Sequence, residues 1–300
     1  MRTLFILALL VALSASTSAE PVWEVQRNGK KIYVIGSVHA AKPSRPPLSS
    51  FIKKLISDAD LVYFEIDPKG SAMAAPRPTP SASTLAASQY ADLAAAAISE
   101  SSMYLKYCFG NDLSSIASFE PWRWIIECDV LWSLRSGMDV RFGTESLAMR
   151  QLPEAKPILT AGLEDLNSLV GLLGGIPPDH WLHFFRENMR NRDPIEIIKG
   201  IEDQVSETLF PSEESIESSI HESWYSTAEK RAISAWMIDH RNIEFFSKMN
   251  RALSSKTMTV FFVGNSHTLG PSGVVSQFRA LGDVNVRFIS NEKQVVEADR

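Results

Sequence analysis

The sequence predicts an α/β fold with a mixed central sheet flanked by helices, built on two β-Gly-x-x-His-α-β units with a helical insertion between them. Near each end of the chain, a short apolar run (residues 32–35 and 260–263) ends at a glycine, with a histidine three residues later. Each is followed by a stretch of helical spacing and another short apolar run. The residues between the two units show mainly helical periodicity.

The composition excludes two classes of protein. Of the 300 residues, 45% are hydrophobic and 22% are charged, which is typical of a globular protein and excludes disorder along the whole chain. The formal net charge of -5 leaves no basic excess to bind a phosphate backbone. We therefore expect no nucleic-acid partner.

The first 19 residues have the pattern of a signal peptide. A basic residue, Arg2, precedes an apolar run over 4–13, and small residues lead to Ala19 at the expected cleavage position. An apolar run this short cannot cross a hydrocarbon core, which needs about 20 residues. We expect cleavage after Ala19, a mature chain from Glu20 without a membrane anchor, and a periplasmic or secreted location.

The mature chain is expected to begin with a β-hairpin. Two strand-like runs flank Asn28-Gly29, a pair that readily adopts the positive φ angles of a tight hairpin turn. Residues 48–56 then have helical spacing, and residues 61–66 are typical of a short buried strand. This order predicts a β-loop-α-β unit.

The middle of the chain is expected to be mainly helical. Residues 69–102 are rich in Ala, Ser, Pro and Thr, and we expect a flexible excursion that buries little, within one domain over 20–300. Residues 118–249 are mainly helical in pattern, with short strand candidates at 139–142 and 156–160. The tryptophans of this region are expected to pack in a helical core: Trp122, Trp124, Trp132, Trp181, Trp224 and Trp236.

The end of the chain repeats the opening unit. A β-branched run over 257–263 ends at Gly264, a short helical pattern over 274–281 is closed by Gly282, and residues 284–289 indicate a last strand.

The two Gly-x-x-His motifs are the strongest functional signal. With six histidines and 15 glycines in the chain, even one chance occurrence is uncommon, yet Gly36 and His39 are matched by Gly264 and His267. Ligands of α/β sheets bind at the carboxyl ends of strands, where both motifs lie. If the two units are adjacent, both histidines face one cleft; separately, each is more typical of a structural histidine bonded to backbone.

Two charged residues occupy apolar patterns. Glu65 ends the strand over 61–66, where it must be paired, metal-bound or exposed at the strand end, and Asp67 shares its face. Arg241 lies on the apolar stripe of a helix, so it needs an anionic partner such as Glu65 or a substrate group. The alternative for Arg241 is that its side chain reaches the surface.

Other metal or redox sites receive less support from the sequence. Cys108 and Cys128 can form a disulfide in an oxidising compartment, but their spacing matches no metal motif and does not decide whether they pair. His180 and His183 lie one helical turn apart, yet their aromatic neighbours favour packing over metal binding.

These motifs, in their order, resemble the TraB/GumN family, which includes the Tiki Wnt-inactivating proteases within a wider group with erythromycin esterase and ChaN. The resemblance covers most of residues 22–290. It is carried by Gly36-Ser-Val-His39, Phe64-Glu65-Ile-Asp67, Gly162-Leu-Glu164, Asp239-His-Arg241-Asn242 and Gly264-Asn-Ser-His267 with Gly270 and Gly273. Where the family commonly has a glutamate before the Arg-Asn pair, this chain has His240.

The resemblance implies a cleft at the two Gly-x-x-His loops and, for the Tiki branch, a metal-dependent peptidase. We therefore expect His39, Glu65 and His267 to hold a divalent metal ion, with Arg241 stabilising an oxyanion. A metal-free hydrolase in which a histidine activates water uses the same residues. Supporting positions are Gly36, Gly264, Asn242, Glu164 and Asp67.

The substrate is expected to be a peptide or another small molecule. The alternative function is a non-catalytic binding or accessory protein, for polysaccharide export or for haem or metal binding, in which the histidines hold a ligand without turnover.

Overall fold

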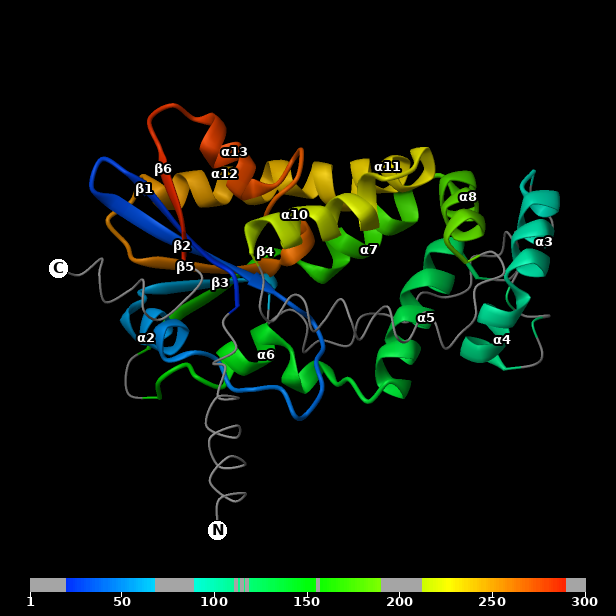
Figure 1. Ribbon diagram of the computed structural model, residues 1–300, viewed down its shortest axis with the longest axis horizontal. Coiled ribbons are helices and arrows are strands. Elements are labelled where there is room, and N and C mark those ends of the chain that lie inside the picture. Colours follow the sequence, from blue (N-terminus) through cyan, green and yellow to red (C-terminus); the bar gives the residue numbers. More distant parts are fainter. Residues whose placement is uncertain are drawn as a thin grey trace, which may run out of the picture.

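The computed structural model describes residues 20–67, 89–110, 113, 116, 119–154, 157–189 and 212–289. In these ranges a six-stranded mixed sheet lies between helices, which confirms the predicted fold class (Figure 1). The predicted signal peptide over 1–19 is outside the described residues. Among the helices that are described, none combines the length and the apolar character needed to cross a membrane.

The sheet has the strand order β4-β3-β5-β2-β1-β6. Strands β4, β3, β5 and β2 are parallel neighbours, whereas β1 is antiparallel to both β2 and β6. The predicted hairpin joins β1 to β2, and its turn residues Asn28 and Gly29 have φ angles of 51° and 75°. The strands are β1 (Val22–Arg27), β2 (Lys30–Ser37), β3 (Leu61–Ile66), β4 (Leu159–Glu164), β5 (Thr259–Gly264) and β6 (Asn285–Ile289).

The two Gly-x-x-His units lie side by side because β2 and β5 pair directly in parallel. From β2 the chain passes through α2 (Ser50–Asp58) to β3, on one side of this pair, and from β5 it passes through α13 (Val274–Ala280) to β6 on the other. The two helices pack on opposite faces, as Figure 1 shows: Ile52 joins the cluster of Ile35, whereas Phe278 joins that of Val34. Such a reversal of winding opens a crevice at the carboxyl ends of the strands.

The insertion between the two units is helical and has an apolar core of its own. Trp124, Trp181 and Phe185 are fully buried in this core, which lies at the end of the molecule away from the sheet (Figure 1). The helices between β3 and β5 are α3 (Ala91–Glu100), α4 (Ser102–Phe109), α5 (Pro121–Arg135), α6 (Thr144–Met149), α7 (Leu166–Gly175), α8 (Pro178–Met189), α10 (Glu213–Ile220), α11 (Ala228–Ser234) and α12 (Arg241–Leu253).

The predicted tryptophan core is found in part. Trp122 is buried beside Trp124 and Trp181, whereas Trp224 is partly buried and Trp236 is 36% exposed on a π-helical turn, Ala235–His240. The side chain of Trp132 is outside the described residues.

Three expectations about the middle of the chain need correction. Residues 139–142 are not a strand, because the Asp139 side chain accepts a hydrogen bond from Arg141 N at 2.8 Å and starts a 3-10 turn, Val140–Phe142. The strand expected at 156–160 is β4, Leu159–Glu164, which lies later because it pairs with β3. The excursion expected over 69–102 is wrong for α3, where Ala94 and Ala97 are buried against the helical core, since alanine is a strong helix former. Residues 68–88 are outside the described residues.

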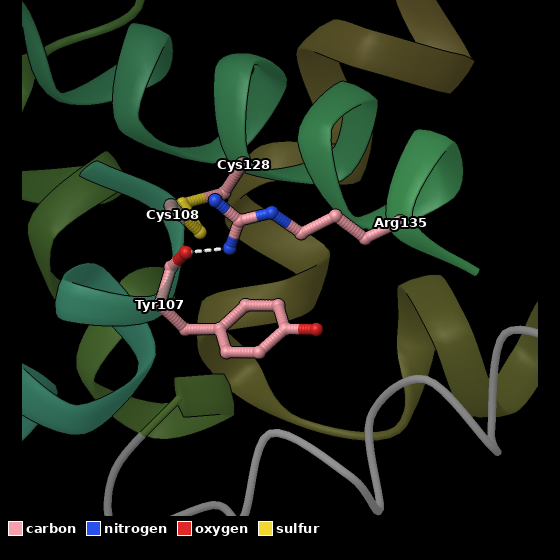
Figure 2. The surroundings of a disulfide bond; sticks show 4 residues. All are labelled: Tyr107, Cys108, Cys128 and Arg135. Atoms are coloured by element: carbon pink, nitrogen blue, oxygen red, sulfur yellow. Dashed lines mark hydrogen bonds between the residues drawn. A yellow bond between two sulfur atoms is a disulfide. The ribbon is translucent and has the colours of Figure 1, made fainter. Parts of the chain in front are cut away.

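The two cysteines are paired. Cys108 of α4 and Cys128 of α5 form a disulfide with a Cα–Cα distance of 5.4 Å, in the helical core (Figure 2). Beside it, Arg135 lies over the Tyr107 ring at 4.6 Å and donates to the Tyr107 carbonyl oxygen. The pairing that the sequence left open is therefore present in the fold, and both ends lie within the helical insertion.

We predict that reduction of this disulfide, or the change of both cysteines to alanine, lowers the free energy of unfolding by about 3 kcal/mol, given the loop of 20 residues that it closes. Urea unfolding followed by circular dichroism measures the loss. The crevice at the sheet should keep its ligand affinity, because no cysteine lies there. An unchanged urea midpoint would contradict the prediction.

Candidate functional site

The carboxyl ends of four parallel strands bring together most of the residues that the sequence singled out. His39 follows β2, and His267 lies on the 3-10 turn Asn265–His267 directly after β5. Glu65 is near the end of β3, and Glu164 is the last residue of β4. Arg241, in the first turn of α12, contacts both of these glutamates.

Glu65 is the buried centre of this group, with 4% of its surface exposed. Its Oε1 accepts from Arg241 Nη2 at 2.5 Å, and its Oε2 accepts from the backbone N–H of Gly264 at 2.7 Å. Oε2 also lies 3.7 Å from His39 Nε2. Burial alone would raise the pKa of Glu65, but Arg241, both histidines and the Gly264 N–H outweigh it, so the pKa is lowered and the carboxylate stays ionised.

Gly264 makes room for this carboxylate. A Cβ on Gly264 would lie 2.9 Å from Glu65 Oε2 and 3.5 Å from His39 Nε2. Gly36 has the same role in the first motif, because a Cβ there would meet the side chain of Asn265 at 1.9 Å. The glycines of the two motifs therefore allow side chains of the site to pack closely against the backbone at the strand ends.

Arg241 is surrounded by acceptors. Its Nη2 contacts Glu65 and Glu164, and its Nε donates to Glu164 Oε2 at 3.2 Å. Its Nη1 donates to Met237 O at 3.1 Å and lies 3.0 Å from His267 Nε2. A guanidinium has five N–H donors, and these contacts use all of them.

This geometry gives Arg241 a role different from the one we expected. Because its donors are engaged by protein groups, Arg241 has none to offer to an oxyanion; instead it is the counter-charge between the buried Glu65 and the partly buried Glu164. The partner expected from the apolar pattern, Glu65, is present, and the surface-reaching alternative is excluded because Arg241 is 6% exposed. For Glu164, burial raises the pKa and the contacts with Arg241 partly offset this effect.

His267 is held as a neutral imidazole. Burial, together with the charge of Arg241, lowers its pKa to about 3. Its Nδ1 lies 2.7 Å from Asn242 Oδ1, while Asn242 Nδ2 donates to Ser272 O at 3.1 Å. Since Asn242 thus presents an acceptor, His267 Nδ1 carries the proton and Nε2 accepts from Arg241. The lone pair that a metal ion would need is already used.

The group that can hold a metal ion differs from the expected one in one member. Among the described residues, ligand atoms of His39, Glu65 and Glu145 lie within 4.8 Å of one another. Glu145, on the first turn of α6, stands where His267 was expected, and it accepts from Ser37 Oγ at 3.1 Å. His180 and His183, on α8, do not belong to this group.

Glu145 differs from Glu65 in the direction of its pKa shift. Burial raises its pKa to about 7, the charge of Glu65 adds to this effect, and His39 and Ser37 oppose it. A carboxyl group that shares a site with an ionised carboxylate holds its proton more tightly, because the two negative charges repel. At neutral pH, Glu145 therefore exchanges readily between its neutral and ionised forms.

The sequence contains little that would have identified Glu145. It follows Gly143-Thr144 in a region without a strand or a named motif, and it reaches the site because of a contact between distant segments. Thr144 N donates to Val38 O at 2.9 Å, which aligns the start of α6 with the loop that carries His39. A single glutamate after a Gly-Thr pair is too common a pattern to be informative.

A pocket of about 650 Å³ lies on the β4 side of Arg241. Asp67, Glu164 and Arg241 line it together with His240 and Lys248. Asp67 is held at its edge because its backbone N–H donates to Glu164 O at 3.1 Å. The residue that departs from the resembled pattern, His240, thus lies at the pocket and not among the candidate metal ligands.

A model of the TraB/PrgY/gumN family matches residues 21–284. The chain belongs to this family. The match spans both Gly-x-x-His motifs, Glu65 and Arg241, so the residues of the crevice are part of the shared region. Searches of curated proteins and of solved structures find no match.

We predict that Gly264→Ala displaces the Glu65 carboxylate and lowers the free energy of unfolding by about 1–3 kcal/mol, since the added methyl group overlaps its oxygen. Chemical denaturation measures the loss. The control is Gly282→Ala, where a Cβ would meet nothing within 4 Å. Equal stability of the two variants would contradict the close packing at the crevice.

We predict that Arg241→Met lowers the free energy of unfolding by about 3–5 kcal/mol, because it leaves the buried Glu65 and the partly buried Glu164 without their counter-charge. Glu65→Gln should cost less, since Arg241 keeps Glu164, and the double variant should cost less than the sum of the two. The exposed pair of Arg279 with Glu213 offers the control, Arg279→Met, with a loss below about 1 kcal/mol. Additive losses would contradict the coupling.

Proposed function

We propose that the protein is an exported, metal-dependent hydrolase, peptidase-like in its chemistry, whose divalent cation is held by His39, Glu65 and Glu145. The observation that carries this proposal is the convergence of one imidazole and two carboxylates at the crevice of the two Gly-x-x-His loops. One nitrogen and two carboxylate oxygens suit a divalent cation of the Zn²⁺, Mn²⁺ or Fe²⁺ type.

The electrostatics of the site favour a cation. Glu65, Glu145 and Glu164 are three carboxyl groups, and Arg241 forms ion pairs with two of them, Glu65 and Glu164. With a pKa of about 7, Glu145 carries a proton for part of the time at neutral pH, although a carboxyl group is normally ionised there. A cation bound there would replace this proton, as expected for a ligand that must be ionised.

Access and order also support a catalytic site. The His39 side chain is 64% exposed, which leaves one side of the group open to solvent and substrate. Glu65 is fixed by Arg241 and Gly264, so at least one ligand is preorganised before a cation arrives. A bound divalent cation with an open position lowers the pKa of a water molecule and supplies the nucleophile for hydrolysis.

Two features support action outside the cytoplasm. The first 19 residues have the pattern of a cleavable signal peptide, and Cys108 is paired with Cys128. Disulfides persist in oxidising compartments and are rare in reducing ones. We therefore propose a periplasmic or secreted protein that acts on a peptide or another small substrate that it meets there.

The proposal predicts the behaviour of Glu145→Gln in the metal-free protein. The pKa of Glu145 is higher in the folded protein than in the unfolded chain, so the protonated carboxyl group favours the folded state. Its contribution to stability is complete below about pH 4.5 and is lost as pH rises through about 7, where the carboxyl group ionises. Glu145→Gln should therefore be more stable than the wild type at pH 8, on the order of 1–3 kcal/mol, and equal to it at pH 4. Thermal melts at both pH values measure this.

The same variant tests the function. Zn²⁺ or Mn²⁺ added to metal-free wild type should bind more tightly as pH rises through about 7, and Glu145→Gln should bind at least tenfold more weakly. Glu222→Gln is the control, because that carboxylate is exposed on another helix. A screen of peptides and esters with the metal-loaded wild type then decides the chemistry: metal binding without turnover would support an accessory role, and no metal binding would overturn the proposal.

A further inference from the structure

A buried ion pair joins the expected first residue of the mature chain to the loop after β2. Glu20 is 2% exposed, and its Oε1 contacts Nη2 of Arg45, whose side chain is 1% exposed. Burial removes both charges from water, and the attraction between them repays this cost only in part. The presence of this ion pair is therefore better explained by the segments that it holds in position than by a gain in stability.

Arg45 connects this pair to the start of α6. Its Nη1 donates to Phe142 O at 2.9 Å, and its Nη2 donates to Thr144 Oγ1 at 3.0 Å. Thr144 in turn bonds the loop of the first motif: Val38 N donates to Thr144 Oγ1 at 3.2 Å, and Thr144 N donates to Val38 O at 2.9 Å. Val38 and Thr144 directly precede His39 and Glu145.

Two more contacts complete the seam between residues 38–45 and 139–145. Ala41 and Asp139 form an isolated antiparallel bridge. Gly143 packs so closely on His39 that a Cβ would lie 2.3 Å from the His39 carbonyl oxygen. The spacing between the two candidate ligands His39 and Glu145 therefore depends on this seam.

The hydrogen bonding of the ion pair between Glu20 and Arg45 is incomplete, which limits its contribution to stability. Within the described residues, Glu20 Oε2 and Arg45 Nε are buried and have no hydrogen-bond partner, and such atoms cost free energy. Its geometry is nevertheless specific, because Gly36 N donates to Pro21 O at 2.9 Å and so fixes the position of Glu20 at the end of β2. One carboxylate oxygen thus orients the guanidinium that bonds Phe142 and Thr144.

We propose that Glu20 is a positioning residue for the metal group: through Arg45 it holds the loop that carries His39 against the start of the helix that carries Glu145. This inference rests on the proposed function for its consequence, metal affinity, but not for the seam itself. Outer contacts that orient metal ligands typically change affinity by about 10–100-fold. Because the expected cleavage follows Ala19, Glu20 is the first residue that the mature chain can use for this purpose.

The test compares Glu20→Ala with Glu24→Ala in the chain that begins at residue 20. Glu24 is the matched control: it is a carboxylate on β1 that accepts from Tyr33 and Arg287, away from the seam. Amide hydrogen exchange should accelerate over residues 36–49 and 139–150 in Glu20→Ala but not in Glu24→Ala. The Kd for Zn²⁺ should rise at least tenfold in Glu20→Ala alone.

A second variant guards against a general loss of folding. Thr144→Val keeps the shape of the side chain and removes the hydroxyl shared by Arg45 and Val38, so it should loosen the same two segments. The positioning role would be overturned if hydrogen exchange were unchanged in both Glu20→Ala and Thr144→Val, or if both variants bound Zn²⁺ with wild-type affinity. Either result would leave the proposed function intact. Local loosening in a protein whose wild type binds none of Zn²⁺, Mn²⁺ and Fe²⁺ would support the role of Glu20 in holding the two segments together and would overturn the proposed function.

Discussion

The crevice depends on one arrangement, the guanidinium of Arg241 held between the carboxylates of Glu65 and Glu164. The carboxylates of the buried Glu65 and the partly buried Glu164, at the ends of neighbouring parallel strands, would repel each other without a positive charge between them. Arg241 comes from a third segment, so β3, β4 and α12 are fixed relative to one another by the same group. The planar guanidinium is required, because its Nε, Nη1 and Nη2 groups donate to acceptors that lie in three directions. A lysine ammonium, with a single nitrogen, could not reach all of these acceptors.

The same group also fixes the state of His267. The positive charge of Arg241 disfavours the protonated form of His267, and Arg241 Nη1 donates to the lone pair of His267 Nε2. His267 is therefore neutral, and its free nitrogen already has a partner. The two Gly-x-x-His motifs are thus alike in sequence and different in role. His39 is exposed and lies beside Glu65 and Glu145, whereas His267 joins Asn242 to Arg241 inside the fold.

Much of this could be predicted from the sequence because it is local or repeated. The hairpin at Asn28-Gly29, the strand over 61–66 and the recurrence of Gly-x-x-His all follow from short patterns, and the family resemblance is confirmed. What could not be predicted depends on contacts between distant segments. Glu145 reaches the site only because α6 contacts the loop after β2, and the alanines of α3 are buried only because a core formed by residues far along the chain covers them.

The negative charges of the crevice are unevenly compensated. Arg241 contacts two of the three carboxyl groups, Glu65 and Glu164, whereas the third, Glu145, has a pKa raised to about 7 and so carries a proton for part of the time at neutral pH. A residue that served stability alone would be a glutamine here, neutral at every pH and free of repulsion from Glu65. A carboxyl group retained at a place where its ionisation costs free energy is typical of functional sites. Of the three carboxyl groups, Glu145 is the one for which the structure shows no contact with Arg241, and its ionisation therefore costs the most free energy. An added positive charge would stabilise the site most at this position.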